Sequence, residues 1–285
     1  MTVFEKNCQA ISGRDKSTNM RNILIIFFLL TTFSCDNKRV EINPKVDSYP
    51  MTVGTEWIYD REIIIKKYES ETSDQIINTD KYNFTVRVWV DKDTLLKDTI
   101  KVMVFKAEEN NDNWTFRNYK LIDNEGLKNL AYSGSSNFFA KKKGTLKLPF
   151  ILYFNSLLEN MIQIDDEIIY EEQPTLDIKF PLINGSSWIY RHSKIPEIPS
   201  IEKEVIGTER LNLAGENFDC FKVYWNNLNI TDTGGIKITD WISNKGLIKR
   251  IEFFDRIYLR NEFGEYSDEP AQITETLVLK ELKIN

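Results

Sequence analysis

The segment YPMTVGTEWIYD at Tyr49–Asp60 recurs 131 residues later as FPLINGSSWIYR at Phe180–Arg191. An aromatic residue, a proline, a glycine and a Trp-Ile-Tyr triplet occupy the same places in both copies. Proline fixes φ and lacks an amide donor, so it suits the entry to a strand, whereas glycine permits the positive φ of a turn. Trp and Tyr stand two positions apart and therefore share one face of a strand. The repeated pattern predicts two strands that begin in the same way.

Eight residues of these segments and of two later turns are interpreted as structural anchors. They are Gly54, Trp57, Tyr59, Gly126, Gly185, Trp188, Tyr190 and Gly246. Large aromatic side chains at strand spacing are usually buried, so packing in two cores is favoured. The functional alternative is that the exposed faces of the Trp-Tyr pairs stack on sugar rings.

Two further pairs repeat in the same order. Lys101-Val102 lies 121 residues before Lys222-Val223, and Gly126-Leu127 lies 120 residues before Gly246-Leu247. Three matching anchors in one order indicate an internal repeat. No segment of eleven or more residues has convincing helical periodicity. The sequence therefore predicts a mainly β fold with little helix, built from two tandem, divergent antiparallel curled sheets of half-barrel or barrel-like form.

Module boundaries follow from the positions of the repeats. The first β module is expected at 49–150 and the second at 180–285, with 151–179 as a connector. The polar stretch Glu69–Asp80 is expected to be a long hairpin loop. The first copy is longer than the second in its early part, and this loop would contain the extra residues. Within the connector, a short strand is expected at Glu167–Tyr170.

The N-terminal region has the layout of an export signal. Residues 1–19 are polar and aperiodic, and we interpret them as an over-called start before Met20. Arg21 supplies a positive charge, and Ile23–Leu30 is an apolar run that is far shorter than the ~20 residues needed to cross a bilayer. Residues 20–35 are therefore predicted to be a signal peptide, and the polar stretch 36–48 a tether.

The end of this signal resembles the lipobox of bacterial lipoproteins, because Ser34-Cys35 places a small residue before a cysteine. The resemblance implies cleavage before Cys35, lipidation of its sulfur and acylation of the new amine. Several acyl chains, at ~0.8 kcal/mol per buried methylene, would anchor the protein stably in a membrane. The alternative is an unmodified cysteine after a conventional signal.

The second copy carries three motifs, FPLINGSSWIY, AGENFDCFKV and DWISNKGLIKR. Together they resemble a group of Gram-negative, Bacteroides-type envelope lipoproteins with a duplicated domain of unknown function. Such lipoproteins are similar to the curled sheets of lipoprotein carriers, which implies a concave apolar face. The resemblance also implies the cell envelope, with an outer-membrane anchor on the periplasmic face or on the cell surface. It supplies no catalytic residues.

Composition excludes several classes of function. The chain has 37 basic and 43 acidic residues, a net charge of −6 and no long basic run, so nucleic acid is not an expected partner. With one histidine and three cysteines, no metal or cofactor site is expected. Cys220 lies between aromatic residues and is predicted to be a buried, inert thiol, while His192 is predicted to face solvent.

We therefore expect a non-enzymatic envelope lipoprotein that binds an apolar or amphipathic ligand, or a partner protein, on a concave sheet face. One alternative is a carbohydrate-binding or glycan-hydrolysing envelope protein, which would need two facing carboxyl groups and an exposed indole. Trp89, Trp114 and Trp225 are the tryptophans on which that alternative depends. The other alternative is a structural subunit of an envelope assembly.

Overall fold

The computed structural model describes residues 42, 44–110, 115–134, 168–192, 200–213, 215–227, 236–260 and 266–285. The predicted over-called start (1–19), the signal peptide with Cys35 and the tether as far as residue 41 lie outside the described residues. The same is true of most of the connector and of Trp114. The predictions for these regions remain predictions.

The described residues contain twelve strands and no helix. The first six are β1 (Glu56–Tyr68), β2 (Ile76–Leu96), β3 (Ile100–Glu109), β4 (Thr115–Ile122), β5 (Gly126–Gly134) and β6 (Ile169–Lys179). The last six are β7 (Ser187–Arg191), β8 (Ile201–Leu213), β9 (Glu216–Asn227), β10 (Ile236–Ser243), β11 (Gly246–Arg260) and β12 (Tyr266–Lys283). The mainly β prediction is confirmed.

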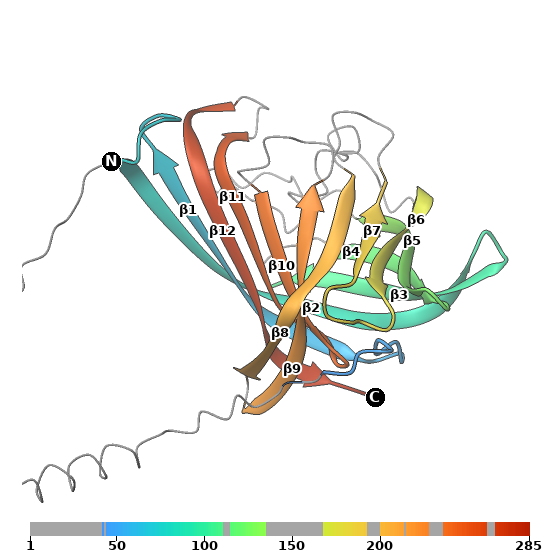
Figure 1. The fold of residues 1–285 in the computed structure, drawn as a ribbon. Helices are drawn as coiled ribbons and strands as arrows, with labels where there is room; N and C mark the ends of the chain where they lie inside the picture. The colour runs from blue at the N-terminus through green and yellow to red at the C-terminus, as the bar shows by residue number, and fades with distance from the viewer. Residues whose placement is uncertain are drawn as a thin grey trace, which may run out of the picture. The chain divides into compact units, whose positions relative to one another are not determined.

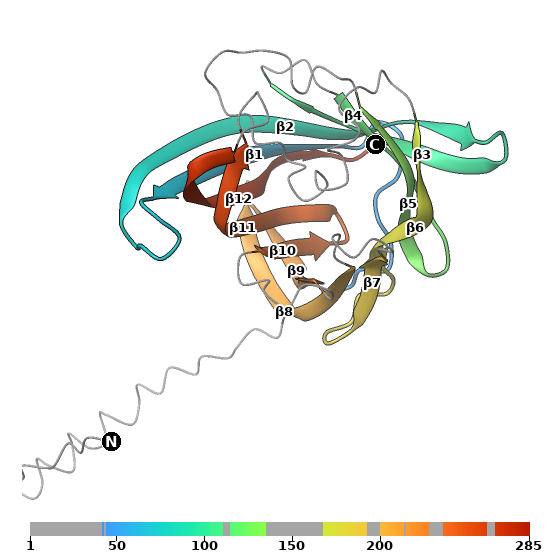
Figure 2. The ribbon, with the colours of Figure 1, turned by 90° about the horizontal axis from the view of Figure 1, so that it is seen from above.

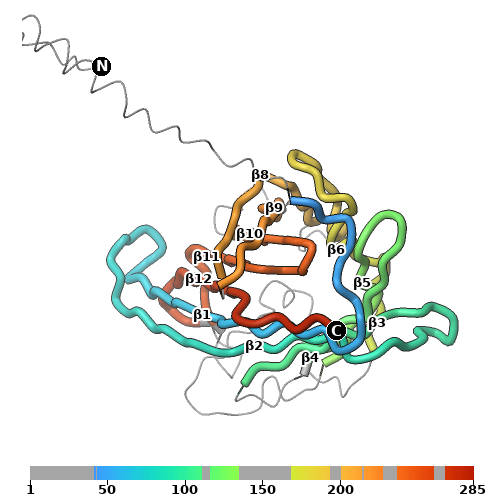
Figure 3. The backbone as a smooth tube through the Cα atoms, turned by 90° about the horizontal axis from the view of Figure 1, so that it is seen from below, coloured from blue at the N-terminus to red at the C-terminus, as the bar shows by residue number. Residues whose placement is uncertain are grey.

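All twelve strands belong to one antiparallel sheet in the order β6-β5-β4-β3-β2-β1-β12-β11-β10-β9-β8-β7. Each half is a meander of sequential neighbours, and the two halves join where β1 pairs with β12, from Glu56↔Lys283 to Lys67↔Ala271. The sheet curls so that its two end strands, β6 and β7, lie side by side (Figures 1 and 2). The predicted pair of curled sheets is thus one continuous barrel-like sheet, as the view from below also shows (Figure 3).

The alternation along β1 explains why one face of the sheet is buried. Trp57, Tyr59 and Ile63 point to the concave side and are buried, while Asp60 between them is exposed. Successive strand residues point to opposite faces, so every second side chain joins the core. Trp57 and Tyr59 belong to one buried apolar cluster and Trp188 to another, so these three side chains pack in the core.

Matching anchors occupy matching places in the two halves. Trp57 lies on β1, the first strand of the first half, and Trp188 lies on β7, the first strand of the second half. Gly126 is the first residue of β5, and Gly246 is the first residue of β11, the fifth strand of its half. The two repeated segments therefore form the first strand of each half, although β1 is paired on both sides and β7 is an end strand.

Positive φ is confirmed at the predicted turn glycines. Gly54 and Gly185, which precede the two tryptophans, have φ of 87° and 79°. Gly246 has φ of 105°, and a Cβ added there would lie 2.9 Å from Nε1 of Trp57. Glycine at 246 therefore serves two needs, a left-handed backbone and close approach of an indole.

Three boundaries differ from those predicted. Val46, at the end of the predicted tether, is buried, and its carbonyl accepts a hydrogen bond of 3.0 Å from the Leu182 amide. The end of the connector forms β6, which runs to Lys179 and pairs with β5. β2 begins at Ile76, inside the predicted loop, because its backbone pairs with β1 whatever the polarity of its side chains. No described helix is long and apolar enough to cross a membrane.

Candidate functional site

The concave side of the sheet lines a partly open cavity of about 180 Å³, and each of the twelve strands contributes at least one residue to its lining. At ~30 Å³ per molecule, this volume equals that of about six waters. Its apolar wall includes Val88, Phe105, Phe116, Leu127, Ile178 and Leu277. Its polar wall includes Lys120, Asn129, Asp177, Lys203, Asp240 and Arg250. The cavity is therefore amphipathic.

Lys203 on β8 is the most unusual group in this lining. The side chain is only 4% exposed, and Nζ donates a hydrogen bond of 2.9 Å to the backbone carbonyl of Asp177. The ammonium lies 4.0 Å from the ring centroid of Trp225 and 4.3 Å from that of Tyr190. Burial lowers the pKa of Lys203 to about 8, although the nearby carboxylate of Asp240 works in the opposite direction.

Asp240 and Arg250 form a second polar feature of the cavity. Arg250 donates two hydrogen bonds to the Asp240 carboxylate, of 2.6 and 2.9 Å, and the Trp225 indole donates a third of 3.0 Å. Burial disfavours charge on Asp240, but these donors hold its pKa below the ordinary value. Both side chains are therefore charged, and each compensates the charge of the other.

The remaining polar lining comes from β4, β5 and β6. Lys120 forms an ion pair with Asp177, which also accepts a hydrogen bond of 3.4 Å from the Thr175 hydroxyl. Asn129 is 5% exposed, and its Oδ1 has no hydrogen-bond partner among the described residues. A buried amide without a partner costs free energy unless water or a ligand satisfies it.

A second polar cluster lies on the same face, around Arg61 of β1. Arg61 donates two hydrogen bonds to Glu275, of 2.8 and 2.9 Å, and one of 2.7 Å to Glu109. Glu252 is paired in register with Glu275 and lies 3.6 Å from Arg250. Burial and the neighbouring carboxylate of Glu275 raise the pKa of Glu252 to about 8. Within this cluster, burial and Glu275 therefore favour the protonated form of Glu252.

The predicted anchors also contribute to the cavity. Tyr59 and Tyr190 both line it, and the Tyr59 hydroxyl donates a hydrogen bond of 2.9 Å to the carbonyl of Leu247. Trp57 and Trp188 lie behind this lining, and each donates its indole N–H to a backbone carbonyl, at 2.7 and 2.9 Å. The four aromatic anchors thus fix the walls of the site.

The sequence analysis missed the charged lining, yet a signal for it exists. Lys203 lies between Ile201 and Val205 in the inward phase of β8, and Asp240 lies between Ile238 and Ile242 in that of β10. A charged residue in the apolar phase of a strand is costly to bury and needs a specific partner. The phase of alternation could therefore have identified Lys203 and Asp240.

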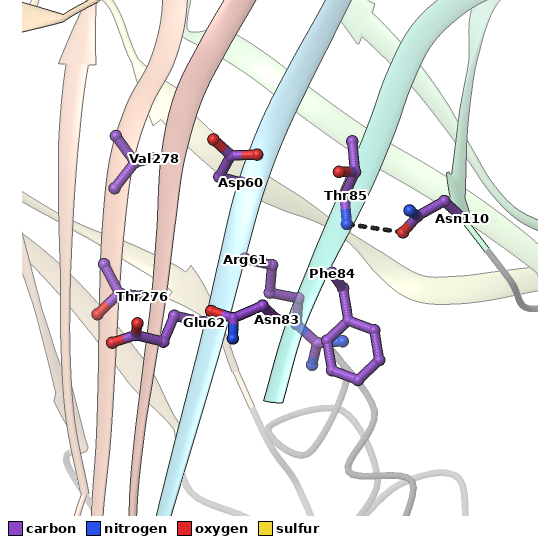
Figure 4. Close-up of a pocket in the computed structure, with 9 residues that line it drawn as sticks. All are labelled: Asp60, Arg61, Glu62, Asn83, Phe84, Thr85, Asn110, Thr276 and Val278. Atoms are coloured by element: carbon purple, nitrogen blue, oxygen red, sulfur yellow. Dashed lines mark hydrogen bonds between the residues drawn. The ribbon is translucent and has the colours of Figure 1, made fainter. Parts of the chain in front are cut away.

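A separate open depression of about 460 Å³ lies over β12, β1 and β2 (Figure 4). Asp60 and Glu62 line it, and they form ion pairs with Lys280 and Lys81. Within the described residues, no tryptophan lines this depression. Among the described residues, the lining therefore offers no indole beside the acidic pair, although the glycan-processing alternative requires one.

The tryptophans named for that alternative are placed differently from one another. Trp89 is half-buried, with the Arg87 guanidinium 4.4 Å from its ring centroid, whereas Trp225 is buried in the cavity wall. Cys220 is buried, and burial raises the pKa of its thiol to about 12, while His192 is exposed. The part of the chain that the structure describes contains no cluster of histidine, cysteine or acidic residues that could hold a metal ion.

No protein-family model matches this sequence, and no curated protein matches it. Among solved structures, a candidate lipoprotein from Parabacteroides distasonis is similar over 85% of this chain and 100% of its own, with 14% identity and a TM-score of 0.32. A candidate exported protein with a YmcC-like fold from Bacteroides fragilis is similar over 84% of this chain and 99% of its own, with 12% identity and a TM-score of 0.29. Values this low define neither a family nor an activity for the chain.

Proposed function

We propose that this chain is a non-enzymatic envelope lipoprotein, anchored through Cys35, whose curled sheet binds a small amphipathic ligand in its interior cavity. The observation that carries the proposal is the cavity of about 180 Å³ with an apolar wall and a charged wall. Pockets of this kind, apolar with a few convergent polar groups, are the usual form of small-molecule sites. A partner protein on the concave face and a structural role in an envelope assembly are the alternatives.

Lining residues with both characters support an amphipathic ligand over a purely apolar one. Phe105 and Leu277 offer apolar contact, while Lys203 and Asn129 offer a charge and an amide in the same space. A purely apolar ligand would leave the Asn129 Oδ1 without a donor and the Lys203 ammonium without a counter-charge in a medium of low dielectric constant. A ligand with an apolar body and one polar group can contact the apolar wall and form polar interactions with the other wall.

Occupation of the cavity is tested by filling it. Ala107 lines the cavity on β3, and Ala107→Phe would place a ring in it, while Glu108→Phe places the same ring on the opposite face of the strand. We expect native mass spectrometry of the full-length protein, purified from membranes, to detect a bound small molecule in the wild type and in Glu108→Phe. Ala107→Phe should have lost it. Equal occupancy in the two variants would exclude the cavity as the binding site.

The anchor is tested separately. Intact mass of the membrane fraction should show a diacyl or triacyl addition on the mature N-terminal cysteine, and Cys35→Ala should abolish both the addition and membrane retention. A mature protein without added mass would leave the export prediction intact and refute lipidation.

A further inference from the structure

Three cationic side chains line the cavity, and they differ in whether a carboxylate compensates their charge. Arg250 donates two hydrogen bonds to the Asp240 carboxylate, and Lys120 is ion-paired with Asp177. Lys203 instead donates to a neutral backbone carbonyl and faces two aromatic rings. Three cations against two carboxylates leave one positive charge in the lining, and the contacts place that charge on Lys203.

Asn129 supplies a second, independent sign of a missing ligand. Its amide lines the same cavity, is almost fully buried, and has an Oδ1 that accepts no hydrogen bond among the described residues. An unpartnered acceptor needs a donor, which a hydroxyl group of a ligand or a water can supply but an ionised carboxylate cannot. The Lys203 ammonium therefore points to an anionic group of the ligand, and the Asn129 oxygen to a hydroxyl group or water beside it.

The size of the cavity limits the rest of the ligand. An apolar cavity of ~150 Å³ in another protein accepts benzene. The present volume of about 180 Å³ therefore suits one ring, or a chain of similar bulk, with one carboxylate. Phe105, Phe116 and Trp225 supply ring faces against which such a body can pack.

We infer that the cavity binds a small organic monocarboxylate, with its carboxylate against the Lys203 ammonium and its apolar body against the aromatic wall. This inference rests on the proposed function and specifies its ligand class. A phosphate dianion carries more negative charge than the single uncompensated cation can balance, so it should bind more weakly. A divalent cation has no suitable cluster of ligands among the described residues.

The test uses calorimetry on the full-length, detergent-solubilised protein at pH 7, with benzoate, benzyl alcohol and inorganic phosphate as probes. Benzoate and benzyl alcohol have the same ring and differ in charge. We expect benzoate to bind at least tenfold more tightly than benzyl alcohol, and phosphate more weakly than benzoate. Lys203→Met should reduce benzoate affinity at least tenfold and leave benzyl alcohol affinity within threefold.

Lys222→Met is the matched control, because Lys222 also lies over an indole, 5.3 Å from the Trp241 centroid, but does not line the cavity. Its benzoate affinity should stay within twofold of the wild type. Equal binding of benzoate and benzyl alcohol, or stronger binding of phosphate, would overturn the monocarboxylate inference alone. Binding of neither ring compound would overturn the proposed function as well.

The pH dependence of the wild type gives a second measurement that needs no folded Lys203 variant. The charged groups that influence Lys203 are Asp240, Asp177, Arg250 and Lys120. Benzoate affinity should fall at least fivefold between pH 7 and pH 9.5, as the ammonium loses its proton, while benzyl alcohol affinity stays constant. Glu252→Gln should show the same profile, which separates Lys203 from the other group that titrates near pH 8. A flat benzoate profile would contradict the role of Lys203.

Discussion

The two halves of the sheet meet at two seams that are built differently. At the first seam, β1 and β12 form a continuous ladder of backbone pairs. At the second, β6 and β7 are the two ends of the sheet, and side chains connect them: the Trp188 indole donates to the Leu176 carbonyl, and Arg191 pairs with Glu171. The repeated sequence pattern would make these seams equivalent.

Two local features account for the difference. β7 has only 5 residues, whereas its counterpart β1 has 13. β6 contains Pro174, which has no amide donor, and its pairing with β5 is shifted between Asn129 and Ala131. Proline within sheets is confined to edge strands and irregular positions. The repeated anchors therefore account for the order of the strands. The short β7 and Pro174 of β6 account for the second seam, where the described strands are not joined by a backbone ladder.

The second seam is also part of the cavity wall. Asp177 of β6 and Tyr190 of β7 line the cavity at this seam, and Lys203 lines it from β8, which pairs with β7. The weaker seam and the candidate binding site thus occupy the same region of the molecule.

The largest expected effect comes from removing the buried tryptophan beside each seam. Trp57→Ala at the closed seam should reduce the free energy of unfolding by about 4–5 kcal/mol, and Trp188→Ala at the open seam by about 3 kcal/mol, because both remove a buried indole. Denaturant unfolding measures both values. Trp89→Ala, at a half-buried position outside the core clusters, is the control and should cost less than about 1 kcal/mol. A loss under about 1 kcal/mol for both core variants would refute the anchor assignment.

Replacement of a turn glycine by alanine should also cost more stability in one half of the sheet than in the other. Gly246→Ala should cost about 2–4 kcal/mol, because the residue combines positive φ with a Cβ 2.9 Å from the Trp57 indole nitrogen. Gly185→Ala keeps the strain of positive φ, but its Cβ would meet nothing within 4 Å, so a cost of about 1–2 kcal/mol is expected. Equal losses in the two variants, measured by thermal unfolding, would show that the close approach to Trp57 contributes nothing.

Glu252 makes the stability of the fold depend on pH. Its folded pKa of about 8 lies above the ordinary value of 4.5, so the folded state binds more protons between these values. Stability from this group is complete below pH 4.5 and is lost as pH rises toward 8. Glu252→Gln should therefore gain stability over the wild type as pH rises from 5 to 8, by up to about 1.4 kcal/mol per pH unit. Glu62→Gln, on the outer face, is the control and should run parallel to the wild type; a parallel Glu252→Gln profile would contradict the prediction.

Much of the fold could be predicted from the sequence, because anchors such as Trp57 and Gly246 have strong local requirements. The union of the halves into one sheet could not, since it depends on the long-range pairing of β1 with β12. The cavity was predicted only as a concave apolar face. Its charges were missed because a lysine such as Lys203 is ordinarily read as exposed, and only the surrounding fold shows what compensates it.

The smallest expected effect probes the open seam itself. Trp188→Phe keeps a large ring in the core but removes the indole N–H that donates to the Leu176 carbonyl at 2.9 Å. A single hydrogen bond contributes about 1 kcal/mol, and here it is one of the few connections between β6 and β7. We therefore expect a global loss of only about 1 kcal/mol, with faster amide hydrogen exchange in β6 and β7 and unchanged exchange in β1 and β12. Trp57→Phe removes the equivalent donor at 2.7 Å, but its strand stays in the ladder, so local exchange in β1 should change little. Faster exchange in β1 than in β7 across this pair of variants would reverse the proposed ranking of the two seams.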